Sequence, residues 1–558
     1  MPVSSRHPIT ALLDSPISLK EEASDMESRT YTLSAFLEEA ATRHPHRPAV
    51  VFEDQRIDYA ELNELANRFA SGLLARGLQP GDRVGIYMTN YPEWVIAFFG
   101  IARMGGMIVP MNSRYRGHEL AYIMNNCQGS GLVIGSKFLK SDFVSIVESV
   151  WDTIPSLKQV IVRGEEKSPR MAFFQEILAA GAGHAKDPAL AAASSAIKPE
   201  DPVFILYTSG TTGEPKGAVL TNLNIAQNGE HIAQVMRQDE NDLTLVVVPF
   251  FHCFGCVIGL TASVSAASGV LPLPAFERAE ALRAIEKHRA TIVHGVPTMF
   301  IEYLEEMKDK RYDVSSLRTG VMAGAPCPIE VMKAAHDTMG ANVVIAYGLT
   351  ETSPVITMTQ LDDSLEDRVT TVGRPLPGQE VRIVDDMRRP VPNGQTGELA
   401  VRGYNVMKGY YGNPAATAEA IDREGWFYSG DLATMDDRGY IRIVGRKKEM
   451  YITGGFNVYP REIEEYLFTH PKVANVAVIG VPDARMGEVG WAIVKLADGA
   501  QATEEELIAY CRDQIANFKV PKRIVFVDGY PMTQSGKIQK FRLREMAEKG
   551  TFAQPSGA

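Results

Sequence analysis

One stretch of eleven residues, Tyr207-Thr-Ser-Gly-Thr-Thr-Gly-Glu-Pro-Lys-Gly217, has the composition of a phosphate-binding loop. It contains three glycines, four serine or threonine hydroxyls and one lysine. Glycine lets backbone N–H groups approach an anion closely, hydroxyls donate further hydrogen bonds, and lysine supplies a mobile positive charge. The stretch is not a Walker P-loop, because Gly217 rather than serine or threonine follows Lys216. It therefore indicates binding of a phosphorylated substrate.

Three further segments carry side chains suited to a nucleotide. Tyr347-Gly-Leu-Thr-Glu351 offers an aromatic ring for a purine, a hydroxyl for a phosphate oxygen and a carboxylate for Mg²⁺. The aspartate of Tyr428-Ser-Gly-Asp431 is suited to accept hydrogen bonds from two ribose hydroxyls. Gly324-Ala-Pro326 forms a turn between a predicted strand and a predicted helix. Each segment alone could be an ordinary turn, with Glu351 only a charge at a helix N-terminus.

Two other candidates are single side chains. His252 lies in the apolar run Phe250–Gly255, where a buried core histidine is the ordinary interpretation. Lys537 follows a Ser-Gly turn, where a lysine is also unremarkable by itself. Cys253 and Cys256 form an isolated C-x-x-C, which without a second pair predicts two core residues rather than a zinc or redox site.

Length and composition limit the classes of protein. A chain of 558 residues is too long for one core, so at least two domains are expected. The net charge of −11 argues against a nucleic-acid partner. Five cysteines in so long a chain are typical of a reducing compartment, and without a basic and then apolar leader the cytoplasm is the expected location. A monomer and a homo-oligomer both stay open.

The segment from residue 243 to residue 276 contains no charged side chain and could be mistaken for a membrane span. Pro249, Pro272 and Pro274 interrupt it, whereas a spanning helix needs about 20 mostly apolar residues. We interpret it instead as a buried strand, helix and strand over residues 245–248, 256–267 and 270–273. No integral membrane segment is expected.

Alternating strand and helix patterns predict parallel sheets covered by helices through residue 345. Short strands separated by Gly, Pro and Asn between Val381 and Val401 predict a β-rich subdomain. Beyond a basic run, Thr503 and Glu506 predict a capping box that starts a helix reaching Phe518. The predicted organisation is a loose tail over 1–30, a large domain over 31–444, a hinge over 445–448 and a small domain over 449–558.

The order of these motifs resembles the adenylate-forming superfamily, which contains acyl-CoA synthetases, luciferase and peptide-synthetase adenylation domains. The resemblance runs from about Leu33 to Arg544. It implies an α/β fold: a large N-terminal domain of two α/β sheet subdomains plus a β-rich subdomain, and a small mobile C-terminal α+β domain. Segments 251–255, 294–299 and 318–328 look most like the medium-chain acyl-CoA synthetases of the family-member-2 type.

The resemblance also implies site residues. Those implied for ATP or AMP are Thr208, Ser209, Gly210, Thr211, Thr212, Gly213, Lys216, Gly324, Ala325, Pro326, Tyr347, Gly348, Thr350, Asp431 and Arg446. Those implied for catalysis are Lys537, Thr350, Glu351 and His252, with Glu351 as the magnesium ligand. The implied acyl pocket comprises Phe251, His252, Val296, Gly324, Gly348 and Leu349. Lys448 is the implied hinge, and Gly454 and Gly455 open the implied coenzyme A tunnel.

The implied reaction joins a carboxylic acid to coenzyme A with ATP and Mg²⁺, through an acyl-adenylate. Four segments are predicted to line the acid pocket: residues 248–259, 294–300, 322–327 and 347–355. They contain no Lys or Arg, which favours an apolar monocarboxylic acid, medium-chain or ring-bearing, over a dicarboxylate. Acetate-specific relatives carry tryptophan where Gly348 stands, so Gly348 predicts room for a longer chain. The alternatives are another acid–CoA ligase, a carrier-protein acylator and a non-catalytic nucleotide sensor. The chain departs from the family at Lys540, which replaces the usual arginine.

Overall fold

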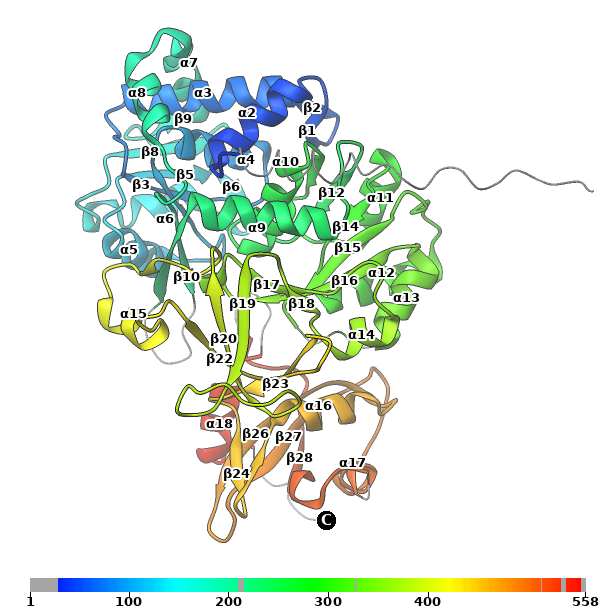
Figure 1. Ribbon diagram of the computed structural model, residues 1–558. Coiled ribbons are helices and arrows are strands. Elements are labelled where there is room, and N and C mark those ends of the chain that lie inside the picture. The colour runs from blue at the N-terminus through cyan, green and yellow to red at the C-terminus, as the bar shows by residue number, and fades with distance from the viewer. Residues whose placement is uncertain are drawn as a thin grey trace, which may run out of the picture.

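Two large sheets, with helices packed on them, make up the upper part of the structure, a computed structural model (Figure 1). It describes residues 29–208, 215–325, 327, 329–512, 514–532 and 538–552. In spatial order the strands of the first sheet are β18 (Arg374–Pro375), β17 (Val355–Met358), β16 (Asn342–Gly348), β15 (Thr319–Ala323), β14 (Ile292–Val293), β12 (Leu243–Val246), β13 (Gly269–Pro272), β1 (Pro48–Phe52) and β2 (Gln55–Asp58). Those of the second are β21 (Gly409–Tyr410), β11 (Lys216–Thr221), β10 (Pro202–Thr208), β4 (Met107–Pro110), β3 (Arg83–Tyr87), β5 (Gly131–Gly135), β8 (Gln159–Arg163) and β9 (Ala172–Phe173).

The centres of both sheets are parallel and their edges include antiparallel pairs, such as β16 with β17 and β10 with β11. Central strands such as β5 and β15 are buried throughout, as expected where helices cover both faces of a parallel sheet. The helices of this part are α2 (Leu33–Arg43), α3 (Tyr59–Ala75), α4 (Pro92–Arg103), α5 (Gly117–Asn126), α6 (Phe143–Glu148), α7 (Phe174–Ala180), α8 (Pro188–Ala196), α9 (Asn222–Val235), α10 (Ala262–Ser265), α11 (Arg278–His288), α12 (Pro297–Asp309), α13 (Ile329–Met339) and α14 (Leu365–Thr370). The predicted α/β sheets are confirmed.

The predicted β-rich subdomain is an antiparallel sheet below the two large ones (Figure 1). Its strands are β19 (Gln379–Val384), β20 (Gly397–Gly403), β22 (Phe427–Met435) and β23 (Ile441–Arg446), and α15 (Pro414–Ala420) lies beside it. A hairpin of β6 (Lys137–Phe138) and β7 (Ser141–Asp142) stands apart from these sheets.

The C-terminal part, coloured orange and red at the bottom of Figure 1, has its own sheet and its own hydrophobic clusters. Its strands are β24 (Tyr451–Thr453), β25 (Phe456–Val458), β26 (Val473–Asp483), β27 (Gly487–Leu496) and β28 (Arg523–Phe526). Its helices are α16 (Pro460–Phe468), α17 (Glu504–Cys511) and α18 (Lys540–Glu548). All members of these two clusters follow residue 450, which fits the predicted α+β unit.

Two predicted helices are wrong in extent. The helix expected over 256–267 is a π-helix over Phe254–Thr261 that continues into α10. Its Gly255 packs so closely on the Pro249 carbonyl that a side chain there would overlap it. The helix expected to reach Phe518 ends at Cys511, where the next residue turns extended, and Phe518 lies in a separate 3₁₀ turn, η5 (Asn517–Lys519).

The capping box at the start of that helix is half formed. The Thr503 hydroxyl accepts a hydrogen bond from the Glu506 N–H at 3.1 Å. The Glu506 carboxylate does not return to the cap, because it pairs with Lys472 at 2.7 Å.

The charge-free segment around α10 is buried, as predicted. Among the helices of the described residues, none has the length and apolar character needed to cross a membrane. Cys253 and Cys256 are core residues as expected, and none of the five cysteines, all of which lie within the described residues, forms a disulfide.

Candidate functional site

The predicted nucleotide residues lie where strands of both large sheets end. Thr208 is the last residue of β10, Gly324 directly follows β15, and Tyr347 is the next-to-last residue of β16. Ligands of open α/β sheets bind beyond the carboxyl ends of the strands. The fold thus brings these segments to one edge, although Thr208 is more than a hundred residues from the other two in the chain.

Asp431 connects two other predicted nucleotide residues, Tyr347 and Arg446. Its Oδ2 accepts a 2.6 Å hydrogen bond from the Tyr347 hydroxyl, and its Oδ1 pairs with Arg446 Nε at 3.0 Å. The second contact follows from the sheet, because Asp431 on β22 stands opposite Arg446 on β23. Burial and the Asp431 carboxylate raise the pKa of Tyr347 well above its usual range, so Tyr347 is a hydrogen-bond donor here. Asp431 also raises the pKa of the Arg446 guanidinium.

Thr350 and Glu351 are the first two residues of a single 3₁₀ turn, η4 (Thr350–Thr352). The carboxylate of Glu351 accepts a 2.8 Å hydrogen bond from the hydroxyl of Tyr410, and its backbone carbonyl accepts from Met407 N–H at 2.9 Å. Burial and this carboxylate raise the pKa of the Tyr410 hydroxyl. The Lys216 ammonium lies 5.3 Å from the centre of the same tyrosine ring. Tyr410 therefore joins the phosphate loop to the Tyr-Gly-Leu-Thr-Glu segment.

These contacts fit the predicted magnesium ligand. Mg²⁺ is usually held by one or two carboxylates together with substrate phosphates and water, rather than by a complete protein cage. Glu351 supplies a half-buried carboxylate at the carboxyl edge of the sheet. Within the described residues no group of three or more His, Cys, Asp or Glu side chains is arranged to hold a metal. The Glu351 carboxylate is compatible with a metal that substrate phosphates would also hold.

The predicted acyl-pocket residues come from separate segments. Phe251 and His252 are half-buried just before the π-helix, and Phe254 N–H donates to His252 Nδ1 at 3.1 Å. Val296 and Gly324 face each other: a Cβ at Gly324 would lie 3.3 Å from the Val296 Cγ1. Gly324 has a φ of +86°, which favours glycine.

The structure gives a reason for glycine at position 348 that differs from the predicted room for a longer acid. It pairs with Val355 on β17, and a Cβ there would overlap the carbonyl oxygen of Pro354. Any side chain at this position forces the backbone to shift. A tryptophan here, as in the acetate-specific relatives, would displace the backbone as well as fill space, so Gly348 alone does not report the size of the pocket. That Gly348 leaves room for a longer acid stays a prediction.

The predicted hinge residue, Lys448, lies between two residues that form ion pairs. On one side, Lys447 Nζ pairs with Asp386 at 2.9 Å and with Glu398 at 3.1 Å. On the other side, Glu449 pairs with Lys540 on α18 at 2.8 Å. The Lys448 side chain between them is exposed.

The remaining predicted site residues lie in turns, at partly exposed positions or outside the described residues. Gly454 and Gly455 form the turn between β24 and β25 with φ values of +56° and +87°. Ala325 is exposed and Leu349 is half-buried. Outside the described residues lie Ser209, Gly210, Thr211, Thr212, Gly213, Pro326 and Lys537.

Several contacts of the site were not predicted. Tyr410 follows only a Lys-Gly pair, and Glu398 lies in an ordinary strand pattern. Asn228 is fully buried on α9 and bonds to the backbone of Val355. A polar residue inside an otherwise buried helix was the available signal for Asn228, whereas Tyr410 and Glu398 had none.

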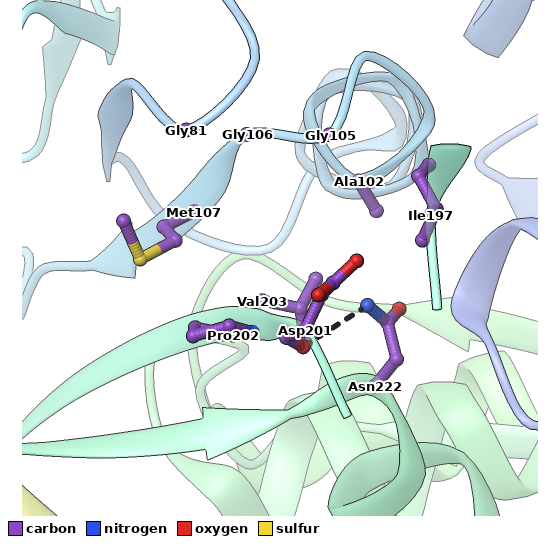
Figure 2. Close-up of a pocket in the computed structure, with 10 residues that line it drawn as sticks. All are labelled: Gly81, Ala102, Gly105, Gly106, Met107, Ile197, Asp201, Pro202, Val203 and Asn222. Carbon is purple, nitrogen blue, oxygen red and sulfur yellow. Dashed lines mark hydrogen bonds between the residues drawn. The ribbon is translucent and has the colours of Figure 1, made fainter. Parts of the chain in front are cut away.

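A pocket of about 270 Å³ lies at the opposite end of β10 (Figure 2). Its wall includes Pro202, the first residue of β10, together with Asp201 and Asn222. A strand of seven residues separates it from Thr208 by roughly 20 Å. This pocket is therefore distinct from the predicted nucleotide site.

The fold and this edge define a nucleotide-binding α/β enzyme with a separate C-terminal unit. The chain matches the family described as AMP-binding enzyme over residues 37–411 and the AMP-binding enzyme C-terminal domain over residues 462–537. It therefore belongs to the AMP-binding enzyme family.

Individual relatives agree with this assignment. The chain is 43% identical over 534 residues to the putative acyl-CoA synthetase YngI of Bacillus subtilis, covering 92% of this chain and 96% of that protein. It is 37% identical to the human mitochondrial medium-chain acyl-CoA ligase ACSF2, covering 93% and 88%. Within the family it therefore groups with the acyl-CoA synthetases and ligases.

Solved structures show the same fold. ATP-bound MatB from Rhodopseudomonas palustris aligns with a TM-score of 0.79 at 30% identity, covering 92% of this chain and 99% of that one. The anthranilate CoA ligase AuaEII in complex with anthranoyl-AMP aligns with a TM-score of 0.84 at 26% identity, covering 95% and 99%. Both support the predicted large and small α/β units.

Proposed function

We propose that this chain is an AMP-forming ligase that joins an apolar monocarboxylic acid to coenzyme A with ATP and Mg²⁺. The observation that carries the proposal is the link from Tyr347 through Asp431 to Arg446, next to the turn that bears Thr350 and Glu351. Tyr347 would face the adenine, Asp431 the ribose and Thr350 the α-phosphate. Glu351 would hold Mg²⁺, which neutralises charge on the phosphates.

In the first half-reaction, a carboxylate oxygen attacks the α-phosphorus of ATP and the bond to the β-phosphate breaks, releasing pyrophosphate. Two negative charges about 4 Å apart repel by roughly 4 kcal/mol at an effective dielectric near 20. Lys537 is proposed to reach both groups and to offset this repulsion as charge develops.

In the second half-reaction, the coenzyme A sulfur attacks the acyl carbonyl, the acyl–phosphate bond breaks and AMP leaves, while the thiol proton passes to solvent. We propose that the unit after Lys448 first rotates, withdraws Lys537 and presents the turn at Gly454 and Gly455. The anchoring of Lys447 and Glu449 to different parts of the structure supports a pivot at Lys448.

The proposed acid is medium-chain or ring-bearing. The four predicted pocket segments carry no cation, so a second carboxylate would be buried without a partner at a cost of several kcal/mol. The similarity to ACSF2, a medium-chain acyl-CoA ligase, supports the same size range. Its mitochondrial location is not transferred. Five cysteines that form no disulfide favour a reducing compartment such as the cytoplasm.

The half-reactions test these assignments separately. Lys537→Ala should abolish acid-dependent pyrophosphate release and largely spare thioester formation from a supplied acyl-adenylate. Equal loss of both rates would remove Lys537 from its proposed role. ATP binding without any pyrophosphate release by the unmodified protein would favour the nucleotide sensor instead.

A further inference from the structure

A row of buried polar side chains lies along one face of α9. Asn224, Asn228 and His231 are 4%, 0% and 2% exposed, and their spacing places them on the same side of the helix. Buried helix faces are normally apolar, and polar groups in such positions are retained with hydrogen-bond partners. None of the three belongs to the motifs assigned above.

Asn228 holds the backbone of one residue at two points. Its Nδ2 donates to the Val355 carbonyl at 2.9 Å, and its Oδ1 accepts from the Val355 N–H at 3.1 Å. The Asn228 side-chain amide thus makes the two hydrogen bonds that the backbone of a neighbouring strand would make with Val355. Val355 begins β17 and stands opposite Gly348 at the end of β16. Asn228 therefore fixes the strand pair from which the η4 turn protrudes.

The turn between these strands is closed by its own contacts. Leu349 N–H donates to the Pro354 carbonyl at 3.0 Å, and the buried Thr352 hydroxyl also donates to it at 2.8 Å. Thr350 and Glu351 stand on this closed turn. A shift of Val355 would move both side chains together, because the turn has little internal freedom.

The same helix face holds a second segment that reaches Glu351. Asn224 Nδ2 donates to the Tyr404 carbonyl, and His231 Nδ1 lies 3.0 Å from the Tyr404 hydroxyl. Asn228 Nδ2 also donates to that hydroxyl, at 3.3 Å. Three residues further along, Met407 N–H donates to the Glu351 carbonyl. The α9 face thus fixes Glu351 from both sides.

We propose that Asn228 is a positioning residue for Thr350 and Glu351, which sets how the enzyme holds the magnesium-bound phosphates of ATP. This inference rests on the proposed function, since it assumes that η4 faces ATP. Asn228 touches neither substrate nor metal in this account. Its effect passes through the backbone of Val355 and through the Tyr404 hydroxyl, on the segment that leads to Met407.

The chain offers a matched control on the same helix. Asn222 is also a buried asparagine, 3% exposed, and it bonds to Leu33 N–H at 3.2 Å and to the Asp201 carbonyl at 3.3 Å. Figure 2 shows the second of these bonds in the pocket at the far end of β10. Asn222→Ala removes equivalent hydrogen bonds without touching the η4 turn.

The test measures binding of a non-hydrolysable α,β-methylene ATP by calorimetry, with Mg²⁺ and with EDTA, and in parallel the adenylation rate. We expect Asn228→Ala to weaken binding of the ATP analogue about tenfold or more when Mg²⁺ is present. Binding of the analogue in the presence of EDTA should stay nearly unchanged. The Mg²⁺ concentration that gives half-maximal adenylation should rise. Asn222→Ala should keep the Mg²⁺ dependence of the unmodified protein, even if it lowers the melting temperature as much as Asn228→Ala does.

Equal Mg²⁺ dependence in the two variants would overturn the proposal. If Asn228→Ala does not fold, Gln379→Leu replaces it, because Gln379 Nε2 donates to the same Val355 carbonyl at 3.0 Å. It should weaken Mg²⁺-dependent binding about threefold, and no change would again overturn the proposal. Failure of the proposed function is separate, since it would appear as absent pyrophosphate release in the unmodified protein.

Discussion

Glu449, the first residue after Lys448, pairs with Lys540 at the start of α18, with 2.8 Å between Oε2 and Nζ. Lys540 also pairs with Glu464 on α16 at 2.8 Å. Before Lys448, Lys447 pairs with Glu398 on β20. The chain is therefore tied to the small unit immediately after residue 448 and to the β-rich sheet immediately before it.

This arrangement predicts the effect of fixing residue 448. Proline holds φ near −65°, so Lys448→Pro should stop rotation at this position. We expect adenylation to continue and thioester formation to fall at least a hundredfold, with acyl-adenylate accumulating in single-turnover experiments. Lys448→Ala is the control and should keep both rates. If proline slowed both half-reactions to the same degree, Lys448 would not be the pivot.

Lys540 should be required for the small unit to stay folded. Its side chain is only 18% exposed and serves two carboxylates, so Lys540→Met leaves Glu449 and Glu464 without their partner. Breaking a buried pair in this way costs about 3 kcal/mol. Lys540→Arg restores the family's usual residue and should cost much less. Chemical denaturation monitored by fluorescence of Trp491 on β27 measures both variants, and equal stability of the two would contradict this role.

Most of the fold followed from sequence periodicity. The buried strands and the amphipathic helix α3 were recognisable because their apolar spacing matches one regular structure. The π-helix was not, since its sequence has the same apolar run as an ordinary helix. The end of α17 at Cys511 was missed as well, because no glycine or proline marks it in the sequence.

The candidate site was predictable where a motif was continuous in sequence. Tyr347, Asp431 and Arg446 were each assigned by resemblance, and the structure adds that they touch. Contacts made by isolated residues, such as Tyr410 with Glu351, come from chain crossings that no local pattern encodes.

His294 should make the protein sensitive to acid. It is fully buried, its Nδ1 accepts a 3.1 Å hydrogen bond from Val321 N–H, and burial lowers its pKa to about 3. The unfolded chain binds a proton there below pH ~6.5, whereas the folded chain does not until about pH 3. The stability contribution is thus complete above pH ~6.5 and declines by about 1.4 kcal/mol per pH unit as the pH falls.

Denaturant titrations at pH 7 and pH 5 check this expectation. His294→Asn keeps an acceptor for Val321 and should lose less stability between the two pH values than the unmodified protein. His46→Asn, at a histidine whose side chain is 90% exposed, is the control substitution. An identical pH dependence in the His294 variant would exclude this source of acid sensitivity.

Val296 offers a cleaner test of acid size than Gly348. It faces Gly324 across the predicted pocket and, unlike Gly348, carries a side chain already. Val296→Phe should reduce kcat/KM for longer acids and spare short ones, moving the optimum down by about two carbons. Each buried methylene contributes about 0.8 kcal/mol, roughly a fourfold change in kcat/KM. An unchanged chain-length profile would place the acyl chain elsewhere.

The most direct test of the account is a product analysis of the unmodified protein with ATP, Mg²⁺, coenzyme A and single acids from acetate to medium-chain and ring-bearing acids, with malonate included. We expect one AMP, one pyrophosphate and one acyl-CoA for each acid consumed, with kcat/KM rising from acetate until the pocket is full. Formation of ADP, absence of acid-dependent pyrophosphate, or a preference for acetate or malonate would contradict it.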